Sequence, residues 1–124
     1  MKRARVILAD DHPLMLSVLT NVLEPQFDVI AACSDGADLV KAASKMAPDL
    51  IIADIDMPEL DGIAAAGQIL AAKPTVKVVL FTGHANPIYV RQAIKAKVNG
   101  YVLKTGAATE LMQAIEAVSR GEQY

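Results

Sequence analysis

Five short apolar runs alternate with helix-forming stretches along the whole chain, and this alternation restricts the possible folds more than any other feature. The apolar runs occupy residues 5–9, 27–32, 50–55, 76–81 and 100–104. The helix-forming stretches occupy residues 14–23, 37–46, 63–73, 88–98 and 108–120. Parallel strands need crossover connections, and strands with almost continuous apolar character are covered on both faces. The sequence therefore predicts an α/β fold in which one parallel sheet lies between two layers of helices.

The length and composition indicate a single domain over residues 1–124. Hydrophobic residues make up 53% of the chain, which excludes an intrinsically disordered protein. The formal net charge is −2 and aromatic residues make up 4%, so we do not expect the chain to bind nucleic acid by itself. Its apolar runs are too short to span a membrane and its N-terminus lacks signal-peptide features, so we expect a cytoplasmic protein without membrane contact. The single cysteine, Cys33, is expected to be a small buried residue.

Proline, glycine and short polar residues mark the expected ends of the helices. Pro13 and Pro87 stand where a first helical residue belongs, and Gly100 is expected to close the fourth helix. The side chains expected to cap helix N-termini are Asp11, Ser34, Asp35, Asp61 and Asn86. Gly67 lies inside the third helical stretch, where glycine costs about 1 kcal/mol relative to alanine.

Polar residues follow four of the five predicted strands at the point where each strand ends. They are Asp10 and Asp11 at the end of the first strand, Asp54 at the end of the third, Thr82 at the end of the fourth and Lys104 at the end of the fifth. Because parallel strands end at the same edge of a sheet, these side chains are expected to meet there. Three carboxylates in one cleft repel one another, and a divalent cation relieves that repulsion. The oxygen ligands favour Mg²⁺, and the combination of carboxylate, ammonium and hydroxyl groups suits phosphoryl transfer.

Several short motifs resemble those of a known family. Paired aspartates stand at 10 and 11, D-x-x-M-P-x-x-D-G spans 54–62, T-G spans 82–83 and G-Y-V-L-K spans 100–104. In this order and spacing they resemble the receiver domain of two-component response regulators, most closely that of LuxR/FixJ-type transcriptional regulators. The resemblance covers essentially the whole chain. It implies a flavodoxin-like (βα)5 fold, a doubly wound five-stranded parallel sheet in the order 2-1-3-4-5.

The resemblance also implies a role for each residue of the predicted site. Asp54 would accept a phosphoryl group from a histidine kinase, a phosphotransfer protein or a small phosphodonor. The implied Mg²⁺ ligands are the side chains of Asp10, Asp11 and Asp54 and the backbone carbonyl of Asp56. Lys104 would pair with the phosphoryl oxygens. These roles describe a regulatory phosphoacceptor with self-catalysed phosphotransfer and autodephosphorylation, and not an enzyme.

Thr82 and Tyr101 occupy the switch positions of the family. Thr82 would move inward to hydrogen-bond the phosphoryl group, and Tyr101 would turn inward after it. These movements would bias the surface of helix four, strand five and helix five toward a partner-binding form. Asp56 and His84 stand at the positions two residues beyond the acceptor and the threonine, which implies that they tune the lifetime of the modified state.

The segment AIEAVSRGEQY, residues 114–124, resembles the last helix and exit linker of receivers that precede a helix-turn-helix DNA-binding domain. We therefore expect the chain to be the N-terminal part of a longer regulator, with residues 119–124 leading into a linker. The resemblance implies a homodimer on activation, with helices one and five as contact faces, and DNA binding only through the further domain. A stand-alone receiver is the alternative.

Two other functions fit parts of the pattern. Asp54-Ile55-Asp56 also resembles the nucleophile and acid-base pair of haloacid-dehalogenase-type phosphatases, although those carry the pair on their first strand. A receiver-like interaction module that is never phosphorylated is the second alternative. A nucleotide-binding site is excluded because neither G-x-x-x-x-G-K-[ST] nor G-x-G-x-x-G occurs.

Two further expectations concern the loops around the site. His12 and His84 have no companions at metal-site spacing, so both are expected in solvent-exposed loops. Many receivers have a proline after the site lysine, joined by a cis peptide bond, whereas Thr105 and Gly106 follow here. A non-proline cis bond costs about 2.5–4 kcal/mol, but functional sites tolerate such strain. We therefore expect that the Lys104–Thr105 bond is cis.

Overall fold

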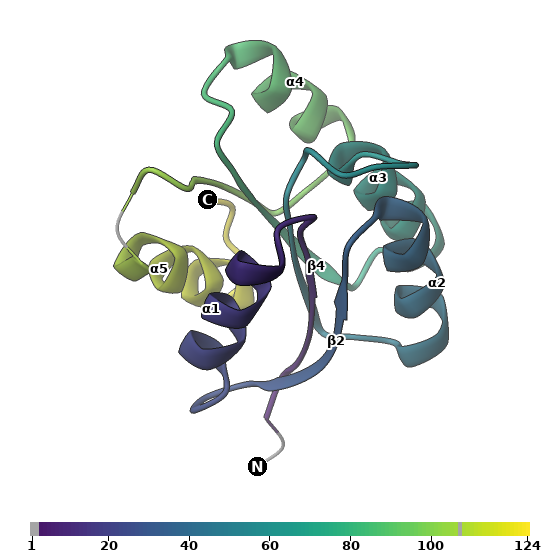
Figure 1. Ribbon diagram of the computed structural model, residues 1–124. Helices are drawn as coiled ribbons and strands as arrows, with labels where there is room; N and C mark the ends of the chain where they lie inside the picture. The colour runs from purple at the N-terminus through teal and green to yellow at the C-terminus, as the bar shows by residue number, and fades with distance from the viewer. Residues whose placement is uncertain (1–2, 107) are drawn as a thin grey trace.

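The computed structural model describes residues 3–106 and 108–124, and within them five strands form one parallel sheet (Figure 1). The strands are β1 (Arg5–Ala9), β2 (Asp28–Cys33), β3 (Leu50–Ala53), β4 (Lys77–Thr82) and β5 (Gly100–Leu103). The helices are α1 (Pro13–Leu23), α2 (Gly36–Met46), α3 (Gly62–Ala72), α4 (Pro87–Lys95) and α5 (Ala108–Ser119). The strand order is β2-β1-β3-β4-β5, and every adjacent pair is parallel. The predicted fold and strand order are confirmed.

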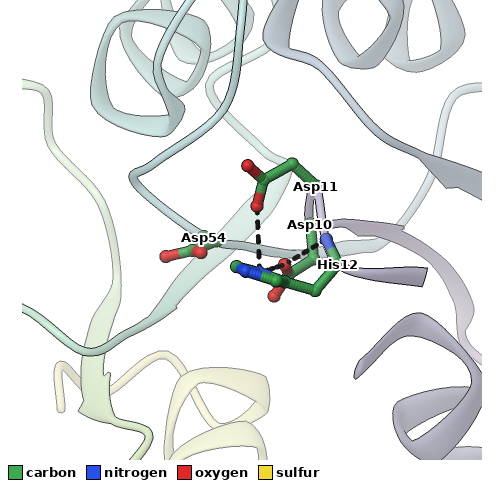
Figure 2. Close-up of side chains that lie close together, drawn as sticks. All are labelled: Asp10, Asp11, His12 and Asp54. Carbon is green, nitrogen blue, oxygen red and sulfur yellow. Dashed lines mark hydrogen bonds and ion pairs between the residues drawn. The ribbon is translucent and has the colours of Figure 1, made fainter. Parts of the chain in front are cut away.

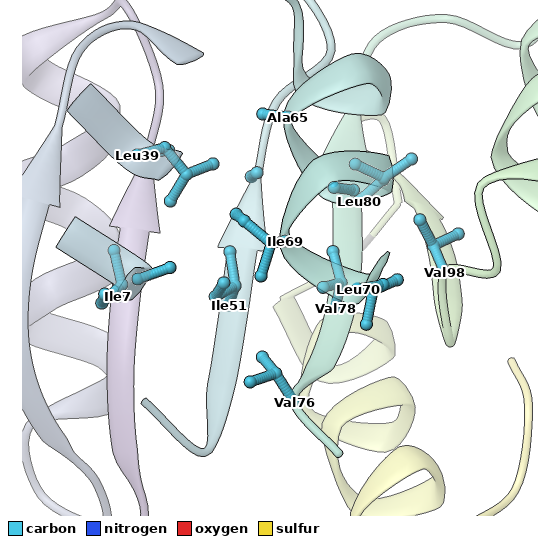
Figure 3. Close-up of a cluster of buried hydrophobic side chains, with 14 of the residues drawn as sticks. Ile7, Leu39, Ile51, Ala65, Ile69, Leu70, Val76, Val78, Leu80 and Val98 are labelled. Carbon is cyan, nitrogen blue, oxygen red and sulfur yellow. The ribbon is translucent and has the colours of Figure 1, made fainter. Parts of the chain in front are cut away.

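Alternate side chains of the central strands point to opposite faces of the sheet, and each face has its own apolar core. On one face, Ile7 and Ile51 belong to a cluster completed by α2 and α3 (Figure 3). On the other face, Leu8 and Ile52 belong to a cluster completed by α1 and α5. Figure 1 shows these two helix pairs on opposite sides of the sheet. Successive residues of a strand point to opposite faces of the sheet, and both faces are covered here, so the central strands are apolar at nearly every position. Cys33 is buried, as predicted.

Most of the predicted helix starts are confirmed. Pro13 and Pro87 are the first residues of α1 and α4. Three side chains accept hydrogen bonds from N–H groups of the first turn that follows them: Asp35 in α2, Asp61 in α3 and Asn86 in α4. The prediction that Asp11 caps α1 was wrong. His12 holds that position, but its side chain makes no capping bond to the first turn of α1, and the carboxylate of Asp10 accepts the backbone N–H of His12.

The predicted end of the fourth helix was also wrong. Helix α4 ends at Lys95, and Lys97 then adopts a positive φ of 69° that turns the chain. Gly100 instead opens β5. A Cβ atom there would lie 3.3 Å from the side chain of Val79 and 3.5 Å from that of Val118. The glycine therefore allows β5 to pack closely between its neighbouring strand and α5.

Two properties of the backbone complete the description. Among the described residues no peptide bond is cis, so the prediction of a cis Lys104–Thr105 bond was wrong. The trans form is the lower-energy state for any residue not followed by proline. None of the described helices is both long enough and apolar enough to cross a membrane.

Candidate functional site

Backbone hydrogen bonds hold the predicted site residues at the carboxyl edge of the sheet. Asp10 and Asp54 are the first residues beyond β1 and β3. The backbone N–H of Asp54 donates to the carbonyl of Ala9 at 2.9 Å. Lys104 is the first residue beyond β5, and its N–H donates to the carbonyl of Thr82 at 2.8 Å. These bonds extend the ladder of the sheet past the strand ends, so the positions of the side chains follow from the sheet itself.

The ammonium group of Lys104 bridges two buried carboxylates. Its Nζ lies 2.7 Å from Oδ2 of Asp10 and 3.0 Å from Oδ2 of Asp54. Asp10 is 1% exposed and Asp54 is 4% exposed, so water stabilises neither charge well. Burial disfavours the charged form of Lys104, but its hydrogen bonds and its attraction to the two aspartates outweigh burial and raise its pKa. The lysine is the counter-charge of both acids.

Asp11 and His12 complete a cluster of possible metal ligands. Ligand atoms of Asp10, Asp11, His12 and Asp54 all lie within 4.8 Å of one another. Figure 2 shows these four side chains close together. His12 Nδ1 lies 3.0 Å from a carboxylate oxygen of Asp10 and 3.0 Å from one of Asp11. Three carboxylates in this arrangement suit Mg²⁺, which prefers oxygen ligands and retains some of its water. The donor set therefore fits the cation that was predicted.

The two predicted switch residues both contact the backbone of His84. Thr82 is fully buried at the end of β4, and its Oγ1 accepts the backbone N–H of His84 at 3.3 Å. Tyr101 is half-buried in β5, and its hydroxyl donates to the backbone carbonyl of His84 at 2.7 Å. Burial raises the pKa of Tyr101, and the neighbouring Tyr89 and Asp54 add to the effect. The backbone at residue 84 therefore joins β4 to β5 beside the carboxylate cluster.

The two predicted tuning residues contact each other. Nε2 of His84 lies 2.6 Å from Oδ2 of Asp56, so this contact joins the loop after β4 to the loop after β3. His84 lies in a loop, as predicted, but its side chain is only 30% exposed, so the prediction of a solvent-exposed position was wrong. Its partner lies 28 positions away in the sequence, and no local pattern reveals such a pairing.

His12 is exposed, as predicted, but its contact with the two aspartates was not foreseen. The only signal in the sequence is that His12 directly follows the acidic pair. That adjacency does not determine the ring orientation, which depends on how α1 begins.

Comparison with known proteins identifies the family to which the chain belongs. The family model of the response regulator receiver domain matches residues 6–116, a range that contains the whole carboxylate cluster and Lys104. The chain belongs to the response regulator receiver family. This is a family of signalling proteins, and receiver domains generally bind Mg²⁺ at an acidic pocket. The cluster of Asp10, Asp11 and Asp54 is an acidic pocket of this kind.

The curated relatives of this receiver are longer proteins. The chain is 33% identical over 124 residues to the transcriptional regulatory protein DegU of Brevibacillus brevis. It is 38% identical over 120 residues to the transcriptional regulatory protein LiaR of Bacillus subtilis strain 168. These alignments cover 98% and 95% of this chain but 52% and 57% of the two relatives. The chain therefore spans about half the length of the curated relatives it matches.

Solved structures show the same receiver fold. A two-component response regulator of the LuxR family from Aurantimonas sp. SI85-9A1 matches with a TM-score of 0.93 and 30% identity, over 98% of this chain and 89% of that one. The isolated receiver domain of RcsB from Salmonella enterica serovar Typhimurium, in the presence of phosphomimetic BeF3−, matches with a TM-score of 0.90 and 29% identity, over 99% and 93% of the two chains. These likenesses confirm the resemblance to LuxR-type receivers.

The geometry also separates the site from that of the phosphatase alternative. Enzymes of the haloacid-dehalogenase type carry their two aspartates after the first strand, whereas Asp54 here follows β3. The carboxylate of Asp56 is 65% exposed and is paired with His84. The Asp56 carboxylate is therefore already paired with His84, whereas a phosphatase of this type would use it as an acid-base group. The family match also supports a receiver.

Proposed function

We propose that this chain is a phosphoacceptor domain of a two-component system and that Asp54 is the residue that becomes phosphorylated. The observation that carries the proposal is the position of Lys104, whose ammonium contacts both Asp10 and Asp54 beside the cluster of ligand atoms. A carboxylate held next to a fixed positive charge is suited to attack a phosphoryl group, because that charge stabilises the phosphoryl oxygens in the transition state. The donor would be a histidine kinase, a phosphotransfer protein or a small phosphodonor.

In the proposed transfer, a carboxylate oxygen of Asp54 forms a bond to phosphorus while the bond from phosphorus to the donor breaks. The leaving atom of the donor, a ring nitrogen in phosphohistidine, keeps the electron pair of that bond. One oxygen of Asp54 already accepts the backbone N–H of Ile55 at 2.7 Å, and the other contacts Lys104. These two contacts orient the carboxylate before the donor arrives.

The residues that would hold Mg²⁺ are Asp10, Asp11 and Asp54 through their carboxylates and Asp56 through its backbone carbonyl. The convergence of the three carboxylates supports this assignment. When bound, Mg²⁺ would supply positive charge that neutralises the carboxylates and the incoming phosphoryl oxygens. Lys104 would then be free to exchange its contact with Asp54 for a contact with a phosphoryl oxygen.

Thr82 and Tyr101 would carry the change away from the site. The Thr82 hydroxyl lies at the same strand edge as the acceptor and would hydrogen-bond the phosphoryl group after a short movement. Tyr101 would turn inward after that movement and alter the surface formed by α4, β5 and α5. Asp56 and His84 would set how long the modified state survives, because their loops flank the acceptor.

The output of the domain is also part of the proposal. We place the boundary of the receiver at residues 1–124, with 119–124 leading into a linker, as the N-terminal part of a longer transcriptional regulator. The LuxR-family likeness and the greater length of the curated relatives support this assignment. RcsB, one of the structural neighbours, has been solved in complex with DNA, with a TM-score of 0.90. Phosphorylation would promote a homodimer, and DNA would be bound only through the further domain.

The proposal is tested by incubating the protein with Mg²⁺ and a small acyl phosphate, followed by intact-mass measurement. The wild-type protein should gain one phosphoryl group, and the Asp54→Asn variant should gain none. Asp56→Asn is the matched control, since it removes a nearby carboxylate while leaving the acceptor in place. It should still be phosphorylated, with a changed rate of loss.

The same experiment distinguishes the alternatives. A phosphatase would release many equivalents of phosphate per protein without holding a stable phosphoryl group. An interaction module that is never phosphorylated would show neither release nor mass gain. Either result would contradict the proposal, as would equal phosphorylation of the wild-type protein and the Asp54→Asn variant.

A further inference from the structure

His84 contacts four separate parts of the structure around the site, which is more than a role in tuning the loss of the phosphoryl group would require. Its ring Nε2 lies 2.6 Å from the carboxylate of Asp56, and its ring centroid lies 4.3 Å from that of Tyr89 in α4. Its backbone N–H donates to Thr82 and its carbonyl accepts the hydroxyl of Tyr101. One residue therefore touches the loop after β3, the end of β4, helix α4 and strand β5.

We infer that the side-chain bridge between His84 and Asp56 is a latch that holds the loop after β4 in its resting position. The inference rests on the proposed function and adds to it a way in which the resting state is maintained. This bridge joins the loop after β3 to the loop after β4. The other observed contacts of His84 are with Thr82 in β4, Tyr89 in α4 and Tyr101 in β5, and none of these three residues belongs to the loop after β3. Breaking it frees the second loop from the first.

The latch opposes the movement that phosphorylation demands. Thr82 lies two residues before His84 and is hydrogen-bonded to it, so an inward shift of Thr82 displaces His84 relative to the loop after β3. The same displacement disturbs the bond between Tyr101 and the carbonyl of His84, which holds the tyrosine in its present position. The latch therefore ties the threonine and the tyrosine to a common resting arrangement, and both are released together when it opens.

The expected size of the effect follows from the exposure of the two groups. The side chain of His84 is 30% exposed and that of Asp56 is 65% exposed, so water screens the bridge. Partly exposed pairs of this kind shift an equilibrium by about two- to fivefold. A ligand that binds only the switched state gains affinity by the same factor when the resting state loses the latch.

The test uses beryllofluoride with Mg²⁺ as a stable analogue of the phosphoryl group, and measures its Kd by calorimetry. His84→Ala and Asp56→Ala should each tighten binding by about two- to fivefold. The double variant should bind no more tightly than the better single variant, because both substitutions remove the same contact. Asp28→Ala, which removes an exposed carboxylate at the start of β2, controls for the change in net charge and should leave the Kd unchanged.

Each outcome has a distinct meaning. If all variants bind beryllofluoride as the wild-type protein does, while the rate of phosphoryl loss differs among them, the residues act on hydrolysis alone and the latch is refuted. Additive effects in the double variant would also refute it, since the two side chains would then act separately. If the wild-type protein does not bind beryllofluoride, the proposed function itself fails and the bridge is a static contact.

Discussion

Two glycines of α3 differ sharply in the space around them, and replacing each with alanine tests how the loop that carries Asp54 is built. At Gly62, the first residue of α3, an added Cβ would lie 1.9 Å from the backbone oxygen of Asp54. At Gly67, in the middle of the same helix, the nearest atom is the Cβ of Ala96 at 3.8 Å, an ordinary contact. The two substitutions are chemically identical and should have opposite effects.

The magnitudes follow from these distances. At Gly62 the obstacle is backbone, so the peptide of Asp54 must move by at least about 1 Å, and such overpacking costs roughly 1–3 kcal/mol. At Gly67 alanine removes the entropic cost of glycine inside a helix and stabilises the fold by about 0.5–1 kcal/mol. The two variants should therefore differ by roughly 3 kcal/mol in the free energy of unfolding.

Urea unfolding followed by far-ultraviolet circular dichroism measures both values. With a slope of about 1–3 kcal/mol per molar urea, the midpoints of the two variants should differ by about 1 M or more, on opposite sides of the wild-type midpoint. If Asp54 is the acceptor, as proposed above, Gly62→Ala should also accept a phosphoryl group more slowly, because the displaced peptide carries Asp54, whereas Gly67→Ala should not. Equal midpoints, or a stabilising Gly62→Ala, would refute the close approach between α3 and Asp54.

Three further predictions concern charge and capping. The pKa values of Lys104 and Tyr101 are higher in the folded protein than in the unfolded chain, so protonation of these two groups stabilises the fold. This stabilisation is complete below about pH 10 and is lost as the pH rises through the raised pKa values. Thermal unfolding between about pH 9 and 12 should show this loss, and a flat profile would contradict it. Lys104→Met leaves two buried carboxylates without their counter-charge and should cost roughly 3 kcal/mol in urea unfolding, of which added Mg²⁺ should restore part. A variant as stable as the wild-type protein without Mg²⁺ would contradict the bridging role. Asp35→Ala removes the N-cap bond of α2 and should cost about 1 kcal/mol, whereas an unchanged midpoint would show that the cap adds nothing.

The elements of the fold were predictable because their signals are local. Each apolar run lies within a few residues of a strand, and each helix-forming stretch overlaps a helix. Periodicity and capping depend on neighbours a few positions apart, so they can be read directly from the chain. The error at the end of the fourth helix arose where local signals compete, because Gly100 lies beyond a helix-forming stretch and also opens a strand.

The acidic cluster was predictable for a different reason. Asp10, Asp54 and Lys104 are far apart in the chain, but a parallel sheet brings the ends of its strands to one edge. Once the alternation of strands and helices is recognised, their convergence follows from topology alone. The sequence by itself therefore determined the fold class and which acidic side chains and lysine lie together at the sheet edge.

Only the tertiary structure decided how the loops around that site contact one another. The bridge between His84 and Asp56, and the bond from Tyr101 to the carbonyl of His84, join residues on different loops and strands. Loop conformations have no sequence period, and the partner of a loop side chain depends on the path of the whole loop. The residue types that gather in the pocket could be predicted from the sequence, whereas the contacts between the surrounding loops depend on geometry that those residue types do not encode.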